Sequence, residues 1–193
     1  LSSFYLDYGK DILYIEGEGS SKRRSMLTVL YTILSKSVRL FAPILSFTAE
    51  EIYDNMPYED AESVHLLDFP VKNVIEDATL EAKWDKLLEV RDDVNKALEE
   101  SRNEKVIGKS LEAAVEIYSN DSEVVELLNS VDNLHQLFIV SSVEVKENDG
   151  ATYDLATVKV TKAQGHRCER CWNIVEKVTE ESLCHRCHSI LNK

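Results

Sequence analysis

The sequence lacks the short motifs by which many enzymes and membrane proteins are recognised. Its 193 residues contain no G-x-S-x-G turn, no H-E-x-x-H helix and no glycine-rich phosphate-binding loop. The absence of these motifs argues against the serine hydrolases, zinc proteases and P-loop nucleotide hydrolases that carry them. No apolar run approaches membrane-spanning length, and no charged leader precedes an apolar segment. We therefore expect a cytoplasmic chain with no membrane segment and no catalytic site of its own.

Positive charge is also scarce. The chain has 22 Lys and Arg residues against 35 Asp and Glu residues, so its formal net charge is −13. Such a charge argues against nucleic acid bound over the whole surface. The charge is uneven, however, because residues 157–193 carry +3 and the remainder of the chain carries −16. We expect any contact with a polyanion to be local, and the C-terminal segment is one of the few places for it.

Cysteine is rare and confined to one segment. Cys168 and Cys171 form one C-x-x-C pair, and Cys184 and Cys187 form a second pair after twelve intervening residues. Two such pairs supply four sulfurs in a tetrahedron, which predicts one Zn²⁺ ion. Rubredoxin-like iron uses the same arrangement and stays open as an alternative. Four thiolates leave no position for a water ligand, so the predicted site is structural.

Histidines near these cysteines are alternative ligands that a four-thiolate site does not need. They are His166, His185 and His188. We expect them at the surface or behind the ligands.

Hydrophobic periodicity predicts a mainly α chain. Helices are expected over residues 2–15, from a cap at Ser20 or Ser21 as far as Phe41, and over residues 79–103. A shorter helix is expected to begin with a capping box from Thr48 to Glu51. Strands are expected at residues 113–117, 137–145 and 155–160, with a helix over residues 122–131. We therefore predict a helical bundle over residues 1–107, a small α+β module over residues 108–163 and a four-cysteine zinc finger over residues 164–193.

Two groups of residues are candidates for recognition. Arg170 and Trp172 flank Cys171, so a bound metal would fix where they point. An indole held at a surface can stack on an unpaired base, with an arginine beside it for phosphate or a base edge; alternatively, Trp172 covers the small metal core. Arg23 and Arg24 lie in a basic first helical turn, which either meets an external anion or is simply solvated.

Several blocks of the sequence together resemble a known family. They are LSSFYLDYGKD at residues 1–11, RRS at 23–25, APILSFTAEE at 42–51, SVHL at 63–66, VRDDVNK at 90–96, KSLEA at 109–113, and CERCW at 168–172 followed by C-x-x-C at 184–187. In this order the blocks resemble the C-terminal region of bacterial isoleucyl-tRNA synthetases.

The resemblance implies a helical anticodon-binding domain of the class I type, a small junction module and a terminal zinc finger. Cys168, Cys171, Cys184 and Cys187 would ligate zinc. Arg170 and Trp172 match positions expected to touch the anticodon, and Arg167, Arg23 and Arg24 are further candidates for contact with tRNA.

The resemblance also implies the partners of the chain. These are isoleucine-accepting tRNA and the remaining domains of a parent synthetase, which would attach isoleucine to that tRNA and bind ATP elsewhere, because the H-I-G-H-like and K-M-S-K-S motifs are absent here. We expect a monomer that forms part of a longer protein. The alternative is a zinc-ribbon protein–protein interaction module on an acidic helical scaffold; a DNA-repair-type zinc finger fits the tail alone, and the acidic residues before it argue against it.

Overall fold

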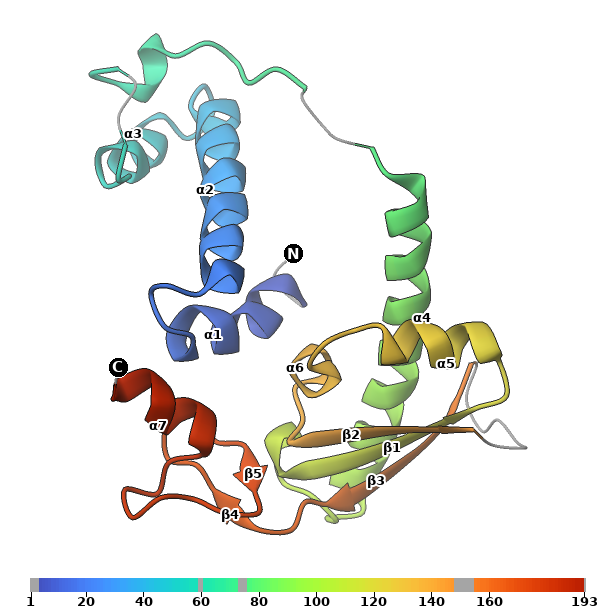
Figure 1. The fold of residues 1–193 in the computed structure, drawn as a ribbon. Helices are drawn as coiled ribbons and strands as arrows, with labels where there is room; N and C mark the ends of the chain where they lie inside the picture. The colour runs from blue at the N-terminus through green and yellow to red at the C-terminus, as the bar shows by residue number, and fades with distance from the viewer. Residues whose placement is uncertain (1–3, 59–60, 73–75, 148–154, 193) are drawn as a thin grey trace. The chain divides into compact units, whose positions relative to one another are not determined.

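The computed structural model describes residues 4–58, 61–72, 76–147 and 155–192 (Figure 1). Contacts within the chain divide it into two compact units. Residues 16–76 form one, called here the helical unit, and residues 1–15 together with 77–193 form the other, called the mixed unit. Helices α1 to α7 and two small sheets account for the regular structure of the described residues, which confirms the mainly α prediction. The three-domain division stays a prediction.

The helical unit contains α2 (Ser21–Phe41), α3 (Ser46–Asp54) and the short 3₁₀ helix η1 (Val64–Leu66). Ser20 caps α2 as expected, since its hydroxyl accepts a hydrogen bond from the Arg23 amide at 3.4 Å. Its core consists of one set of buried side chains: Val38, Ala42, Ala49, Tyr53, Met56 and Val64.

The predicted capping box at the start of α3 is wrong. The helix begins at Ser46, so Thr48 lies inside its first turn and cannot cap it. Glu50 instead accepts hydrogen bonds from the Ser63 hydroxyl at 2.9 Å and the Val64 amide at 3.1 Å. This carboxylate joins α3 to η1.

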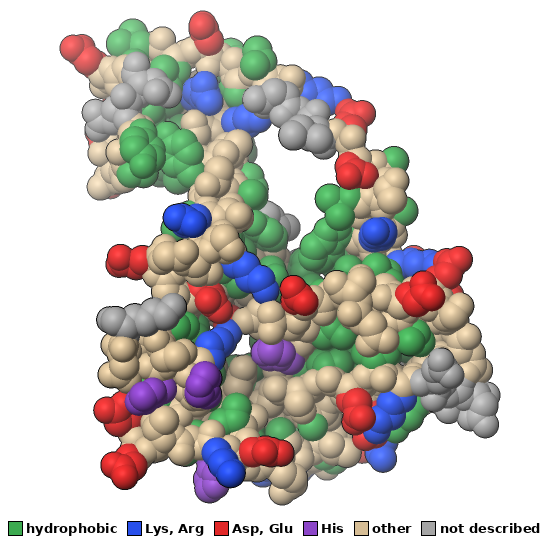
Figure 2. All heavy atoms as spheres, in the orientation of Figure 1, with side chains coloured by type: hydrophobic (Ala, Val, Ile, Leu, Met, Phe, Trp, Pro, Cys, Tyr) green, Lys and Arg blue, Asp and Glu red, His purple; other side chains and the backbone are tan. Residues whose placement is uncertain are grey.

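Hydrophobic side chains gather on the surface of the helical unit around α3 (Figure 2). Ile44 is 78% exposed and Phe47 is 93% exposed. Side chains of this size are seldom left in water at such fractions within one short segment.

The mixed unit begins with α1 (Tyr5–Ile15) and resumes at α4 (Ala78–Asn103). The following elements are η2 (Ser110–Glu112), β1 (Ala113–Ser119), α5 (Ser122–Asn129), α6 (Leu134–Phe138), β2 (Ser142–Glu147), β3 (Thr157–Lys162), β4 (His166–Arg167), β5 (Ile174–Val175) and α7 (His185–Leu191). The three-stranded sheet has the order β2-β1-β3, with β1 parallel to β2 and antiparallel to β3. A parallel pair needs a crossover connection, which α5 and α6 provide.

One predicted strand is half wrong. Residues 137–145 were expected to be extended, but Leu137 and Phe138 lie buried in α6, and Ile139 ends that helix with a left-handed backbone at φ 57°. The strand β2 starts only at Ser142. A short apolar run has no period that separates a buried helix turn from a strand, so tertiary packing decided its conformation.

Helix α4 covers the three-stranded sheet. Its buried residues Val90, Val94 and Leu98 share a core with Val115 and Ile117 of β1. The Asp93 carboxylate, which is fully buried, accepts a hydrogen bond from the Leu155 amide at 2.9 Å. This bond ties α4 to the start of the segment that forms β3.

Within the described residues, no helix combines the length and the apolar character that crossing a membrane would require.

Candidate metal centre and nucleic-acid interface

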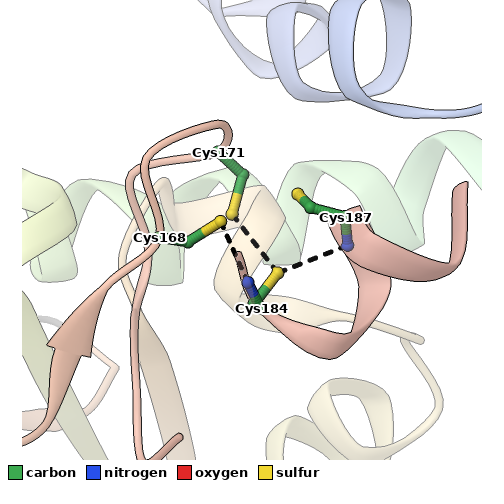
Figure 3. Close-up of side chains that lie close together, drawn as sticks. All are labelled: Cys168, Cys171, Cys184 and Cys187. Carbon is green, nitrogen blue, oxygen red and sulfur yellow. Dashed lines mark hydrogen bonds between the residues drawn. The ribbon is translucent and has the colours of Figure 1, made fainter. Parts of the chain in front are cut away.

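The four cysteines converge on one buried point (Figure 3). Their sulfur atoms lie within 4.8 Å of one another, and Cys171 Sγ is 3.8 Å from Cys184 Sγ. Four sulfurs placed about 2.3 Å from a central ion are separated by about 3.8 Å along each edge of the tetrahedron, whereas a disulfide requires about 2.05 Å. The arrangement is compatible with a metal ion bound by four thiolates.

Local backbone geometry aims the sulfurs inward. Cys184 is the N-cap of α7, and its sulfur accepts a hydrogen bond from the Cys187 amide at 3.5 Å. The Cys184 amide in turn donates to Cys168 Sγ at 3.2 Å. Amide donors of this kind stabilise thiolates and leave the opposite side of each sulfur open to a cation.

The pKa values of the cysteine thiols indicate that the four sulfurs need a cation among them in order to ionise together. Burial acts to raise the pKa of Cys168, but hydrogen bonds from backbone amides outweigh it and lower the pKa to about 6. Burial raises the pKa of Cys171, and burial together with the Cys184 thiol raises the pKa of Cys187 to about 11. Four thiols this close cannot all ionise unless a positive ion lies among them.

An unpaired guanidinium atom beside the cluster gives an independent test of fit. Nη1 of Arg170 is buried and has no hydrogen-bond partner among the described residues, while its Nη2 donates to the Tyr14 carbonyl at 3.3 Å. The Arg170 side chain acts to lower the pKa of Cys187, so it faces the sulfurs. Four thiolates around a divalent ion carry a net negative charge, which would give this buried nitrogen its partner.

Trp172 stands outside the metal core. The residues packed in that core with the cysteines are Ile15, Leu183 and Val175. Trp172 is 56% exposed, and its backbone is left-handed at φ 65°, an uncommon conformation for a bulky residue. Its amide donates to the Cys168 carbonyl at 2.9 Å. The turn between the first two cysteines therefore holds the indole at the surface.

A cavity of about 480 Å³ adjoins this indole. Its walls come from α1, α6 and the first cysteine pair, and include Tyr8, Tyr14, Gln136, Trp172 and Asn173. The volume falls in the range of small-ligand sites, and aromatic walls suit a planar group. The sequence gives no signal for this cavity, because α1 and the cysteine segment lie at opposite ends of the chain.

The predicted basic residues fall into two groups. Arg167 is exposed on β4, 3.5 Å from Glu169, and lies near Arg170 and Trp172 around the first cysteine pair. Arg23 and Arg24 belong to the first turn of α2 in the helical unit. The metal centre and its surroundings belong to the mixed unit, so the candidate residues are divided between the two units.

Comparison with known proteins places the chain in a class. Residues 1–117, more than half of the chain, match the family model described as the anticodon-binding domain of tRNA ligases. The chain therefore belongs to the family of tRNA-ligase anticodon-binding domains.

The more specific resemblance is confirmed as well. The chain is 53% identical over 197 residues to the isoleucine–tRNA ligase of Macrococcus caseolyticus, 54% over 198 residues to that of Staphylococcus epidermidis, and 52% over 201 residues to that of Staphylococcus aureus. Each comparison covers 99% of this chain but only 21–22% of the relative. The chain spans about a fifth of the length of these relatives.

Proposed function

We propose that this chain is the tRNA-binding part of an isoleucine–tRNA ligase and that it contacts the anticodon stem and loop of isoleucine-accepting tRNA. The attachment of isoleucine with ATP would then take place in other parts of the longer protein. The observation that carries the proposal is the exposed indole of Trp172, held beside the cysteine cluster by a left-handed turn.

The proposal includes one structural Zn²⁺ ion held by Cys168, Cys171, Cys184 and Cys187. The support is the convergence of four buried sulfurs, one sulfur pair at the edge length of a zinc–thiolate tetrahedron, and the unpaired Arg170 nitrogen. When bound, zinc supplies no reaction chemistry. It fixes the turn from Cys168 to Cys171, called here the first knuckle, relative to the turn from Cys184 to Cys187, called the second knuckle. Elemental analysis of the purified chain would distinguish zinc from iron.

The proposed RNA contacts centre on the first knuckle. Trp172 would stack on an unpaired base, and the adjoining cavity has room for a splayed base. Arg167 would meet a phosphate from its exposed position, while Arg170 is largely turned inward toward Tyr14. Arg23 and Arg24 are proposed as a second contact at the helical unit.

The longer protein is the second proposed partner. The exposed Ile44 and Phe47 of the helical unit support it, because a surface of this kind is normally covered. The family match favours tRNA binding over a zinc-ribbon protein–protein module. We propose a monomeric chain that works in the cytoplasm.

Binding of the chain to isoleucine tRNA, with and without Trp172, tests the proposal. Stacking on one base is worth about 1–3 kcal/mol, so Trp172→Ala should weaken binding by about 5- to 150-fold. The matched control is Trp84→Phe, which removes the other indole of the chain, on α4, and should leave binding unchanged.

Two further measurements complete the test. A tRNA with another anticodon should bind more weakly than isoleucine tRNA, and binding should weaken as the salt concentration rises, because the proposed arginine contacts to phosphate release counterions. Equal affinity for both tRNAs, or an unchanged affinity after Trp172→Ala, would remove anticodon recognition from this surface.

A further inference from the structure

Helix α1 makes an unusual set of contacts with the cysteine segment. Its Asp11 carboxylate receives two hydrogen bonds of 2.7 Å from the guanidinium of Arg186, which lies between the two cysteines of the second pair. The same carboxylate accepts a third hydrogen bond, also of 2.7 Å, from the side-chain amide of Gln136 on α6. One carboxylate thus joins three helices.

The ion pair is well shielded. The Asp11 side chain is 24% exposed and the Arg186 side chain 28% exposed. Two parallel hydrogen bonds between a guanidinium and a carboxylate fix the orientation of the two groups as well as their distance. A single contact from a lysine ammonium fixes the distance alone.

The remaining contacts of α1 fall on the first knuckle. The Tyr14 carbonyl receives a hydrogen bond from Arg170, and Ile15 packs into the core with the cysteines. Asp11 therefore contacts the second knuckle through Arg186. One turn later in the same helix, Tyr14 and Ile15 contact the first knuckle. Asp11, Tyr14 and Arg170 all line the cavity that adjoins Trp172.

We propose that Asp11 is the positioning residue of the RNA site: by holding Arg186 it sets the orientation of the metal knuckles, and hence of the Trp172 indole, relative to α1. This inference rests on the proposed function, because it concerns the same surface. Asp11 acts through the indole and need not itself touch RNA.

The test compares Asp11→Asn with Asp92→Asn. Both variants remove one negative charge without changing side-chain size, but Asp92 is exposed on α4 and does not line the cavity beside Trp172. Asp11→Asn should weaken binding of isoleucine tRNA by about 5-fold or more, up to the loss seen in Trp172→Ala. Asp92→Asn should bind as the wild type does. Equal or tighter binding by Asp11→Asn would overturn the inference.

A double mutant separates positioning from direct contact. If Asp11 acts through the indole, Asp11→Asn should cause little further loss in a Trp172→Ala background, because the two changes then affect one interaction. A full additional loss would mean that Asp11 touches RNA by itself and would overturn the positioning role.

Fluorescence gives a readout that needs no RNA. In a Trp84→Phe background Trp172 is the only indole, and Asp11→Asn should shift its emission and its quenching by acrylamide while Asp92→Asn should not. Unchanged fluorescence would overturn the inference even if RNA binding fell. If the Asp11→Asn variant loses its metal, the same fluorescence and binding measurements are made on Arg186→Lys. This variant keeps the positive charge near the thiolates and loses the pair of hydrogen bonds to Asp11.

The outcomes also separate this inference from the proposed function. Failure of the wild-type chain to bind tRNA, or of Trp172→Ala to weaken binding, would refute the function. Binding that depends on Trp172 but is indifferent to Asp11 would refute the inference alone.

Discussion

Removal of the metal should unfold the cysteine segment and leave the rest of the mixed unit folded. The reason is the small size of its apolar core. Apart from the cysteines, the buried side chains in that core are Ile15 and Leu183, and Val175 is partly buried against them. The core of α4 and the three-stranded sheet is larger and shares none of these residues.

The free energies of apolar burial and of metal binding indicate which part of the mixed unit depends on the metal. Fully burying an Ile or Leu side chain contributes about 1.5–3 kcal/mol, so the two buried aliphatic side chains supply about 3–6 kcal/mol. A structural zinc ion contributes on the order of 10 kcal/mol to the folding of a small metal-binding module. Loss of the proposed ion would therefore remove the larger share of the free energy that folds residues 164–192.

Hydrogen–deuterium exchange followed by mass spectrometry would measure this directly. After chelation, or in the variant Cys184→Ser, peptides from residues 164–192 should exchange rapidly. Peptides from α4 and β1 should keep their protection. Addition of Zn²⁺ to the chelated wild type is the control and should restore slow exchange. Equal protection of residues 164–192 with and without metal would refute the reasoning, because it would show that packing alone folds the segment.

Three further predictions concern stability. Asp93→Ala should destabilise the chain by about 1–3 kcal/mol, because it leaves a part-buried amide without its acceptor, while the exposed neighbour Asp92→Ala should have little effect in urea unfolding. The Lys146 ammonium lowers the pKa of Glu116 to about 2, so the stabilisation by this carboxylate is present above its ordinary pKa of 4.5 and lost as the pH falls toward 2. The unfolding temperature of Glu116→Gln should accordingly fall less than that of the wild type over this interval. Gly165→Ala should weaken metal retention in a chelator competition, because φ is 127° there and a Cβ would collide with a carbonyl oxygen on the facing strand.

Each of these has a clear contrary result. Equal unfolding midpoints for the Asp93 and Asp92 variants would mean that water satisfies the amide. Parallel pH profiles for Glu116→Gln and the wild type would mean that the ion pair of Glu116 with Lys146 contributes nothing to stability. Normal metal retention in Gly165→Ala, with Gly19→Ala as the unhindered control, would mean that the hairpin of β4 and β5 can shift without disturbing the cysteines.

Elements governed by local rules could be predicted from the sequence. Ser20 caps α2 as expected, and the alternation of Ala113, Val115 and Ile117 corresponds to the buried face of β1. The failures are places where an element begins elsewhere than the local pattern indicates. Helix α3 begins two residues before Thr48, and the apolar residues Leu137 and Phe138 belong to α6 rather than to a strand.

The candidate site was also predictable only in part. Paired cysteine spacing is a local signal, and the convergence of the four sulfurs follows from it. No local rule connects Asp11 with Arg186, which are far apart in the sequence and meet through a fork of two hydrogen bonds. Sequence reasoning therefore found the four converging cysteines, left open whether Trp172 is exposed or covers them, and did not find the helix against which they are held.

The charge of the chain explains why such positioning matters for the proposed function. With −16 outside the C-terminal segment, diffuse attraction cannot bring a polyanion to this surface. Of the arginines on the first knuckle, Arg170 is turned toward Tyr14 and the sulfurs, and Arg167 has Glu169 within 3.5 Å. Electrostatic attraction at the first knuckle is therefore weak, and under the proposed function selectivity would come from the shape of the cavity and the placement of one indole. Both would depend on how firmly the two cysteine pairs are fixed to α1, so the Asp11–Arg186 pair would be a condition for recognition rather than an accessory to folding.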